Sequence, residues 1–488
     1  MRLLLPLVIP LIGALAVALL RDRPQGRDWA AILAGIAELV AVLVMLPDVL
    51  DGQRATFSIA PFLPDASVAL RADPLGILLL LTASPLWLLT TVYSIGYLRG
   101  STASLTRLHV LMAITISATA GVAFSANLIT LYLFYEAMTI ATYPLVTFTG
   151  TNKAAAGGRR YLSYQLGTGI ALFLPAVVLT YTQTGSFALT PGGIFGAEPT
   201  GLLPILTYLL FLFGIAKAAI FPVHAWLPAA MVAPVPVSAL LHSVAVVNVG
   251  VFTLFRVLLD VFGEDAVASL GLGRLTLIAT SVTIVVASLV ALRLENLKEI
   301  LAYSTIGQLS YMVLGMALLN EAGATGGALH LVGHSVSKIT LFFAVGAIAV
   351  GTGATRVNEL RGLGQRMPLL LGVFAVGAAS IVGLPPTVGF LTKYFLFIGV
   401  AETHQWLVLV VLAASTVLSA TYYLRVVRTS LSPMPHVDGR PSAPTSPPLS
   451  GGPVPREMLV PVIITAVLTV LLGVLPGPLL TLVRAAVS

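Results

Sequence analysis

The stretch Asn127–Val146, NLITLYLFYEAMTIATYPLV, is long and apolar enough to cross a lipid bilayer as one helix. Glu136 lies near its middle, although a charged side chain at the centre of a bilayer costs about 2.5–3.5 kcal/mol on insertion scales. A leucine at this position would avoid that cost. We therefore expect the carboxyl group of Glu136 to have a function that needs a titratable group inside the membrane.

The overall composition indicates that most of the chain lies in lipid. Of its 488 residues, 57% are hydrophobic and only 9% are charged, and the mean hydropathy is +0.99. A soluble domain has about 25% charged residues. We therefore predict an all-α integral membrane protein in contact with the lipid bilayer.

The absence of cysteine excludes several kinds of chemistry. Disulfides, thiolate catalysis, iron–sulfur clusters and cysteine-ligated metals all need residues that this chain lacks. The sequence has no glycine-rich phosphate loop and no soluble head that could hold a nucleotide. We expect no catalytic residue, no cofactor, no metal ion and no nucleic-acid partner. A signal peptide is an alternative for the first apolar segment, but no small-residue cleavage site follows it.

Fourteen segments have the length and apolar character of membrane-spanning helices. They lie near residues 3–20, 29–47, 75–97, 106–124, 126–148, 161–183, 202–221, 235–261, 274–293, 299–319, 327–350, 368–398, 405–428 and 458–484. The stretch 430–456 is rich in proline and serine, which is typical of an exposed and poorly ordered loop.

Basic residues gather in alternate loops between these segments. One set of loops carries 17 of the 26 lysine and arginine residues. These are Arg21, Arg23, Arg27, Arg99, Arg107, Lys153, Arg159, Arg160, Arg293, Lys298, Arg356, Arg361, Arg366, Arg425, Arg428, Arg440 and Arg456. Basic loops favour the cytoplasm, so both termini are expected on the outer side. A wrong helix count would scramble this alternation.

Two spans contain internal prolines next to a lysine. They read FGIAKAAIFPVHAWLP, with Lys217 before Pro222, and GLPPTVGFLTKYFLF, with Lys393 after Pro385 and Pro386. Breaks at corresponding places in two halves indicate repeats with a site at the broken helices. Because the breaks are five helices apart, we predict two inverted five-helix repeats, helices 4–8 and 9–13, with helices 7 and 12 broken.

This interpretation divides the chain into five regions. They are an N-terminal three-helix region (1–105), a first repeat (106–262), a second repeat (263–429), a cytoplasmic loop (430–456) and a C-terminal transmembrane helix (457–488).

Glu136 and Lys217 lie on helices of one predicted repeat and carry opposite charges. Burial favours a neutral lysine, whereas a nearby carboxylate favours the charged form. At a separation of about 7 Å and an effective dielectric near 20, the attraction is about 2.4 kcal/mol. A change in their distance could therefore load or release a proton at Lys217. A purely structural ion pair is the alternative.

His330, His334 and Lys338 stand at positions i, i+4 and i+8 of HLVGHSVSKITLFF and share one helix face. A polar stripe on an apolar span normally lines a bundle interior or a wet cavity, and histidine suits a proton relay. Two histidines at this spacing could instead bind a metal or haem. A lysine on the same face disfavours that alternative.

Four further ionisable residues remain inside predicted spans. His242 and Lys393 are candidates for the proton pathway, with a hydrogen-bonded core histidine and a lysine snorkelling to an interface as the respective alternatives. Glu38 stands alone in the second helix, where a structural role is favoured. Arg256 lies toward the outer end of its helix, where it could snorkel or fix a loop.

The chain resembles the antiporter-like subunits of respiratory complex I, of Mrp-type multisubunit cation/proton antiporters and of membrane-bound hydrogenases. The resemblance covers roughly residues 70 to 430 and rests on the following stretches: YEAMTIATYPLV, GIAKAAIFPVHAWLPAAMVAPVPVSALLHSVAVVNVGVF, ENLKEILAYSTIGQLSYM, HLVGHSVSKITLFF and GLPPTVGFLTKYFLF. It implies the same fourteen-helix fold, with helices 7 and 12 broken.

The resemblance also implies roles for particular residues. Glu136, Lys217 and Lys393 match the central proton-handling groups on helices 5, 7 and 12 of the family. His330, His334 and Lys338 match its helix-11 positions.

This chain departs from the family pattern in helix 8 and in its length. Many members have a lysine where this chain has Asn248, so the helix-8 role is assigned to His242. The chain ends after helix 14, like the smaller subunits, and Lys393 favours the Mrp-type D subunit over the middle subunit of complex I.

The leading hypothesis is a proton-translocating subunit of a multisubunit monovalent cation/proton antiporter in a bacterial inner membrane. Its partners would be other membrane subunits, protons, and Na⁺ or K⁺. Protons would load Lys217 and pass along His242, His334 and Lys338 to Lys393. The alternatives are the pumping subunit of a complex I-like oxidoreductase or hydrogenase, the membrane subunit of an inorganic-carbon uptake system, and a stand-alone carrier of organic solutes.

Overall fold

The computed structural model describes residues 2–59, 67–99, 104–433, 436–437, 440–441 and 453–487. Nearly all of them are helical, which confirms the predicted all-α class. The strands of the described residues form two short antiparallel pairs, β1 (Thr56–Ser58) with β2 (Ala69–Arg71) and β3 (His436–Val437) with β4 (Arg440–Pro441). The predicted loop 430–456 lies mostly outside the described residues.

Most helices follow one another with short connections, and longer ones join α2 to α3 and α7 to α8. The first half contains α1 (Leu5–Leu19), α2 (Pro24–Leu50), α3 (Pro74–Tyr97), α4 (Leu105–Ala123), α5 (Leu128–Val146), α6 (Asn152–Thr168), α7 (Leu174–Thr184), α8 (Leu202–Gly214), α9 (Trp226–Ala229), α10 (Val235–Ser243), α11 (Val246–Arg256) and α12 (Gly263–Ser269). The second half contains α13 (Leu272–Arg293), α14 (Leu297–Ala317), α15 (Glu321–Thr352), α16 (Leu363–Arg366), α17 (Pro368–Val382), α18 (Val388–Glu402), α19 (Trp406–Leu431), α20 (Arg456–Val474) and α21 (Gly477–Val487).

Short 3-10 and π-helical turns join or interrupt these helices. The 3-10 turns are η1 (Arg2–Leu4), η3 (Ala216–Ala218), η4 (Val223–Ala225), η5 (Ala230–Val232) and η7 (Val357–Leu360). The π turns are η2 (Gly169–Phe173), which joins α6 to α7, and η6 (Val257–Phe262), which follows α11.

Twelve helical segments of the described ranges are long and apolar enough to cross a membrane. The shorter helices α8 and α17 each end at a break, and the chain continues beyond it as Val223–Val232 and as α18. These two interrupted segments stand where broken helices 7 and 12 were predicted. The count of fourteen crossings and the inverted repeat remain predictions.

Polar side chains mark where several helices begin. The side-chain oxygens of Asp73, Asn127, Thr151 and Asn320 accept hydrogen bonds from backbone N–H groups in the first turns of α3, α5, α6 and α15. These groups would otherwise lack partners, so such caps fix the start of a helix. They lie at the ends of the apolar segments, where the sequence changes from loop to span.

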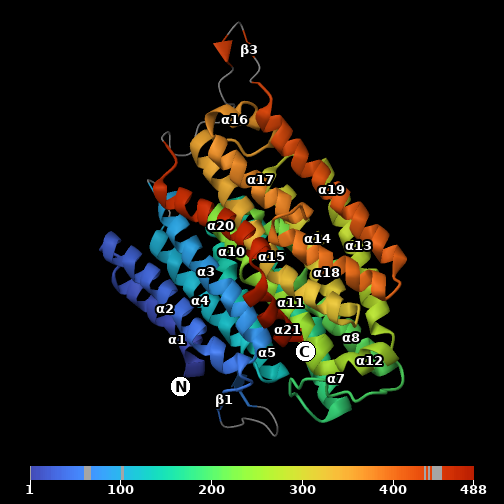
Figure 1. Ribbon diagram of the computed structural model, residues 1–488. Coiled ribbons are helices and arrows are strands. Elements are labelled where there is room, and N and C mark those ends of the chain that lie inside the picture. The colour runs from blue at the N-terminus through green and yellow to red at the C-terminus, as the bar shows by residue number, and fades with distance from the viewer. Residues whose placement is uncertain are drawn as a thin grey trace.

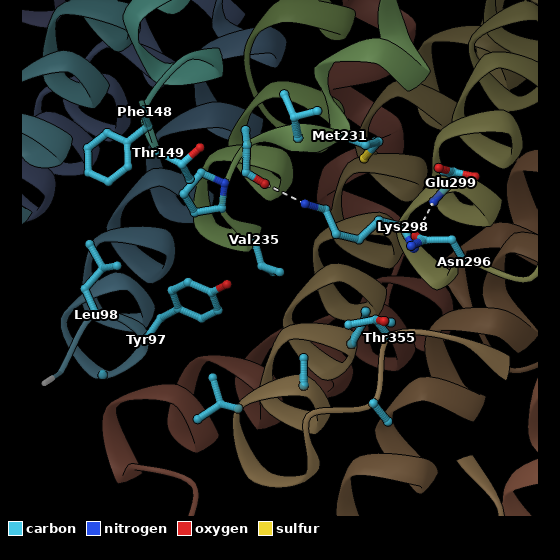
Figure 2. Close-up of a pocket in the computed structure, with 18 of the residues that line it drawn as sticks. Tyr97, Leu98, Phe148, Thr149, Met231, Val235, Asn296, Lys298, Glu299 and Thr355 are labelled. Atoms are coloured by element: carbon cyan, nitrogen blue, oxygen red, sulfur yellow. Dashed lines mark hydrogen bonds between the residues drawn. The ribbon is translucent and has the colours of Figure 1, made fainter. Parts of the chain in front are cut away.

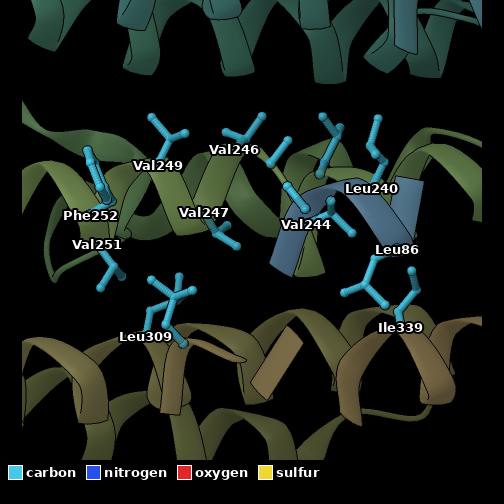
Figure 3. Close-up of a cluster of buried hydrophobic side chains, with 14 of the residues drawn as sticks. Leu86, Leu240, Val244, Val246, Val247, Val249, Val251, Phe252, Leu309 and Ile339 are labelled. Atoms are coloured by element: carbon cyan, nitrogen blue, oxygen red, sulfur yellow. The ribbon is translucent and has the colours of Figure 1, made fainter. Parts of the chain in front are cut away.

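The central element is α15, which packs against α3, α10, α14, α17, α18 and α20. In Figure 1 the N-terminal helices α1 and α2 lie at one end of the molecule and α13 and α19 at the other. Figure 3 shows the apolar packing in the middle, where Leu240 and Val247 face Leu309 and Ile339. The polar residues described next lie inside this packed interior.

The peripheral helices α1, α2 and α19 carry many exposed leucine, isoleucine and valine side chains, Leu15, Ile12 and Leu407 among them. Their inner faces are closed by other helices. An apolar outer surface of this kind suits contact with lipid chains. The chain is therefore a multi-pass integral membrane protein.

Candidate functional site

The break after α8 places a lysine inside the protein. Helix α8 ends at Gly214, and Lys217 lies in the short turn η3 with none of its side chain exposed. Ala219 follows with a φ of 54°. Gly250 of α11 allows this close approach, because a Cβ atom there would lie 2.2 Å from the backbone nitrogen of Ala218. The break depends on a glycine of the neighbouring helix.

The ammonium group of Lys217 is held by α5. Its Nζ donates to the carbonyl of Tyr135 at 3.0 Å and to the Thr139 hydroxyl at 2.6 Å. It also lies 3.2 Å from the centre of the Tyr135 ring, where a cation is attracted to the π face. These contacts compensate for the removal of the amine from water.

Glu136 lies on α5 between these two partners of Lys217. The carboxylate and the ammonium group are within electrostatic range of each other, and the Thr139 hydroxyl lies beside both. Within the described part of the chain, neither carboxylate oxygen has a hydrogen-bond partner of good geometry, so the two groups form no direct ion pair. Glu136 and Lys217 therefore lie near each other, and the hydroxyl group of Thr139 lies next to both.

The eighth predicted span, 235–261, is not one continuous helix. Helix α10 ends at Ser243 and α11 begins at Val246, although no proline stands between them. The side-chain amide of Asn248 donates to the carbonyls of Ser243 and Val244 at 3.1 and 3.3 Å, and to the Ser335 hydroxyl of α15 at 2.7 Å. Asn248 therefore stabilises a third break that the sequence did not predict.

His242 occupies the last turn of α10, next to this third break. Its side chain is fully buried, and neither ring nitrogen has a hydrogen-bond partner among the residues that the structure describes. Its ring stacks between those of Trp226 and Phe342. The Trp226 indole N–H donates to the carbonyl of Ala216, the residue before Lys217, at 2.8 Å. Trp226 thus contacts His242 and the backbone next to Lys217.

The three predicted residues of α15 form one buried row. His330 Nδ1 lies 2.8 Å from the Thr392 hydroxyl and Nε2 lies 3.0 Å from the Gln308 side-chain oxygen. The His334 ring centre lies 6.2 Å from that of His330. Both ring nitrogens of His330 are engaged, so this histidine offers no free nitrogen to the metal or haem considered above.

Lys338 ends this row one turn farther along α15. Its Nζ donates to the carbonyl of Leu301 and to the Tyr423 hydroxyl, both at 3.2 Å. The Tyr423 hydroxyl also lies 2.9 Å from that of Ser304. Lys338 is thus enclosed by α14 and α19, and its side chain is completely buried.

Lys393 occupies the second broken helix in an environment like that of Lys217. Its Nζ donates to the carbonyl of Val382, the last residue of α17, at 2.9 Å and to the Thr416 hydroxyl at 3.0 Å. It lies 5.2 Å from the centre of the Tyr311 ring. Each break thus holds an amine by one backbone carbonyl, one threonine and one tyrosine ring. Only 4% of Lys393 is exposed, which excludes the snorkelling alternative.

Charge neighbours and direct contacts together indicate which of these residues lie next to one another. His242 is within electrostatic range of Lys338, His334 of His242, His330 and Lys338, and His330 of Lys338 and Lys393. Since Thr392 binds His330 and precedes Lys393 in sequence, His330 is the imidazole closest to Lys393 along these contacts. The predicted order passed directly from Lys338 to Lys393, and the contacts favour His330 between them.

Two other ionisable residues have environments that the sequence did not decide. Arg256 is buried and binds Asp73 at 2.6 Å and Asp260 at 2.7 Å, so it fixes the loop before α3 and does not snorkel. Glu38 is fully buried in α2, and over the described ranges its carboxylate oxygens have no hydrogen-bond partner. Neither residue lies in the row.

Several residues of the site were missed in the sequence. They are the hydroxyl, amide and ring partners of the amines and imidazoles, namely Tyr135, Thr139, Trp226, Gln308, Tyr311, Thr392, Thr416 and Tyr423. His109, which is buried and binds the Ser94 hydroxyl at 2.9 Å, was also missed. Threonine and tyrosine occur throughout the apolar spans, so no local signal separates these positions from the others.

Comparisons with known proteins agree with the geometry. Residues 125–419 match the family described as NADH:quinone oxidoreductase/Mrp antiporter, TM. NADH-quinone oxidoreductase subunit N of Desulforudis audaxviator is 32% identical, over 96% of this chain and 95% of the relative. The putative antiporter protein mnhA2 of Staphylococcus haemolyticus is 30% identical, over 86% of this chain and 55% of the relative. The chain thus spans about half the length of that antiporter protein.

Solved structures show the same fold. A chain in the structure of the Mrp complex from Dietzia sp. DQ12-45-1b aligns with a TM-score of 0.86 at 24% identity, over 100% of this chain and 97% of that chain. A chain of the membrane-bound sulfane sulfur reductase, an archaeal respiratory membrane complex, aligns with a TM-score of 0.85 at 23% identity, over 100% of this chain and 96% of that chain.

Proposed function

The chain belongs to the NADH:quinone oxidoreductase/Mrp antiporter membrane family, and from this membership we propose that it translocates protons as one subunit of a multisubunit monovalent cation/proton antiporter. This proposal rests on a longer buried row of ionisable residues, namely Glu136, Lys217, His242, His334, His330, Lys338 and Lys393. Groups that accept and release protons lie one after another in the interior. Trp226 contacts both the backbone next to Lys217 and the ring of His242, and His242, His334, His330 and the lysines Lys338 and Lys393 are charge neighbours of one another. A row of this kind is what proton transfer across an apolar interior requires.

Each residue of the row has a part in the proposal. Lys217 takes up a proton when the carboxylate of Glu136 is close, because a nearby negative charge stabilises the ammonium form. His242, His334 and His330 pass the proton along, Lys338 sets the charge beside them, and Lys393 releases it. The threonine hydroxyls next to the two end lysines orient the amines.

The partners and the location belong to the same proposal. Other membrane proteins assemble with this chain, and the moving ions are protons with Na⁺ or K⁺. The basic loops face the cytoplasm of a bacterial cell and the termini face outward. The Mrp-type D subunit is the proposed counterpart, on the match at Lys393.

A second candidate is the proton-pumping subunit of a quinone-reducing complex. The specific observation in its favour is the 32% identity to NADH-quinone oxidoreductase subunit N, which extends over 95% of that relative. Purification of the native complex and identification of its subunits by mass spectrometry distinguishes the two candidates. Iron–sulfur subunits support the redox complex, and small membrane subunits alone support the antiporter.

The row itself is tested by Lys217→Ala in the assembled complex. Proton flux into liposomes, driven by a cation gradient, is expected to fall by about 100-fold, because proton relay by a positioned group contributes about 10²–10⁴-fold. Unchanged flux in a complex that retains all its subunits would remove Lys217 from the pathway.

A further inference from the structure

An open cavity of about 1770 Å³ lies on the face that carries the basic loops. It is bounded by the end of α3, the start of α6, the turn before α10, the start of α14, the end of α15 and the start of α20. Figure 2 shows its wall, with Tyr97 and Val235 on one side and Asn296, Lys298 and Glu299 on the other. Pockets for small ligands usually measure about 300–1,000 Å³, so a single ion or small solute would not fill this cavity.

Basic side chains dominate the charged lining of this cavity. The lining contains five basic residues and two acidic ones, namely Arg99, Lys153, Arg160, Lys298 and Arg456 against Glu299 and Glu457. Glu457 forms an ion pair with Arg99. Over the described ranges, the other four basic side chains take part in no ion pair. The cavity therefore has an excess of positive charge.

Two of these basic residues, Lys153 and Lys298, repel each other. They are within electrostatic range of each other, and Lys298 is only partly accessible to solvent. The Nζ atom of Lys298 donates to the carbonyl of Ala233 at 2.5 Å, as the dashed line in Figure 2 marks. An ammonium group has three donors, and only this one acceptor is present among the described residues. An anion bound between the two amines would use the remaining donors and reduce the repulsion.

Another part of the lining is apolar and reaches deeper into the protein. Val345 and Ala349 lie in the last two turns of α15, and Val345 precedes the end of that helix by seven residues, a rise of about 10 Å. Tyr97, Val235 and Leu459 add apolar surface from α3, α10 and α20. By contrast, Lys153, Lys298 and Arg456 stand in the first turns of α6, α14 and α20. Basic helix ends beside an apolar wall match a molecule with an anionic end and an apolar end.

We propose that this cavity binds a phospholipid with an anionic headgroup, taken from the leaflet on the side of the basic loops. Its phosphate accepts hydrogen bonds from the amines of Lys153 and Lys298, and an acyl chain lies against Val345 and Ala349. Basic pockets between membrane helices are a common place for anionic headgroups, and lysine binds phosphate as a point charge.

Two other anions fit this cavity less well. Inorganic phosphate would match the amines but would leave the apolar wall in contact with water. An extended acidic segment of another protein would place backbone N–H and C=O groups against that wall without partners. A lipid avoids both costs, because its acyl chain carries no hydrogen-bonding group.

Native mass spectrometry of the complete complex tests the headgroup contact. The complex is purified, stripped of lipid, and titrated with phosphatidylglycerol or with zwitterionic phosphatidylethanolamine. The double variant Lys153→Gln/Lys298→Gln removes both charges, while the new amide at position 298 keeps a donor for Ala233. We expect this variant to bind one phosphatidylglycerol fewer per copy of the chain than the wild type, and phosphatidylethanolamine to bind equally weakly to both.

Arg361→Gln/Arg366→Gln is the matched control. Both arginines are exposed and belong to another basic loop, and neither lines the cavity. This control should bind as much phosphatidylglycerol as the wild type. Equal binding by the wild type and by Lys153→Gln/Lys298→Gln, or equal binding of the two lipids to the wild type, would overturn the proposal. If the double variant assembles poorly, Lys153→Gln alone, at an exposed site, should still weaken phosphatidylglycerol binding.

Ala349→Leu tests the acyl chain separately from the charge. The larger side chain takes space on the apolar wall and leaves every basic residue in place, so phosphatidylglycerol should bind about tenfold more weakly. Excess inorganic phosphate should not displace the lipid from the wild type. Unchanged binding in Ala349→Leu, or displacement by phosphate, would mean that the site holds an anion without its chain and would contradict the proposal.

Cross-linking then locates the lipid. Phosphatidylglycerol with a photoreactive group on its acyl chain is bound to the complex and irradiated, and the labelled peptides are identified by mass spectrometry. We expect label on the peptides that contain Tyr97, Val345 and Leu459, and less of it in Lys153→Gln/Lys298→Gln. Absence of label from these peptides, or occupation of the cavity by a segment of another subunit, would overturn the proposal. None of these measurements uses ion flux, so this proposal and the proposed function can fail separately.

Discussion

The carboxylate of Glu136 occupies the space that a side chain on Gly169 would fill. A Cβ atom on Gly169 would lie 1.9 Å from Glu136 Oε1. Gly169 begins the π turn η2, and a turn of this kind inside a helix is often found at a functional site. The glycine thus sets where the carboxylate points relative to Lys217.

Gly169→Ala is expected to move the Glu136 carboxylate without unfolding the protein, since the clashing atom is the end of a flexible side chain. Cation-driven proton flux should fall by roughly tenfold or more, because small displacements of a working group are costly. Gly167→Ala is the matched control, as a Cβ atom there has no heavy atom within 4 Å. Equal flux in both variants would show that the position of Glu136 does not matter.

Gly250→Ala should disrupt the first break itself. The new methyl group would lie 2.2 Å from the Ala218 nitrogen and 2.3 Å from the Lys217 carbonyl carbon, and neither backbone atom can rotate away. We expect a loss of about 3 kcal/mol or more of stability, the upper part of the usual cost of overpacking. Gly372→Ala, with open space around its Cβ position, should leave the melting temperature in detergent unchanged or slightly higher.

Asn248→Leu should weaken the break between α10 and α11. The carbonyls of Ser243 and Val244 lose their donor, and buried groups left without partners cost about 1–3 kcal/mol. Thr253→Val on the same helix is the control, because its hydroxyl binds the carbonyl of Val249 within an intact helix. A melting temperature of Asn248→Leu no lower than that of Thr253→Val would contradict the proposed role.

The buried carboxylate of Asp73 should make the stability of the folded protein depend on pH, with a defined sign. Burial alone favours its neutral form, but the Arg256 guanidinium, the Gly76 N–H and Arg71 hold the pKa of Asp73 below its usual range. A lowered pKa means that this stabilisation is complete above about pH 4, the unfolded value, and is lost as the pH falls through the folded value.

Thermal unfolding in detergent between pH 7 and pH 2 checks this dependence. Asp73→Asn should be less stable than the wild type at pH 7, and the difference should shrink below about pH 4. Asp265 is exposed and lines the same surface cavity as Asp73, so Asp265→Asn is the matched control and should be as stable as the wild type at pH 7. A difference between Asp73→Asn and the wild type that stays constant with pH would contradict the assignment.

The sequence predicted the membrane class, the two proline-marked breaks and the approach of Glu136 to Lys217. These features follow from local patterns, because apolar length, proline and an unexpected charge are visible in a single stretch. The break at Val244 could not be predicted, since no proline or glycine stands there and its stability comes from Asn248 and Ser335 of α15.

The same limit applies to Arg256. Its partner Asp73 lies 183 residues away, so only the packing of α3 against α11 reveals the ion pair. Likewise, the space that Gly169 leaves for Glu136 depends on how α6 and η2 lie against α5. Sequence identifies which groups are costly in lipid, whereas tertiary contacts determine which of them meet.

The break after α8 also has an electrical consequence. Helix α8 has 13 residues, about 20 Å of rise, against a hydrocarbon core of about 30 Å. The amine at the break therefore lies partway through the membrane's electric field. A full crossing of one elementary charge is worth about 2.3 kcal/mol per 100 mV, so a proton that stops at Lys217 experiences only part of that energy. The membrane voltage then affects the fraction of Lys217 that is protonated, as well as the energy of a complete crossing.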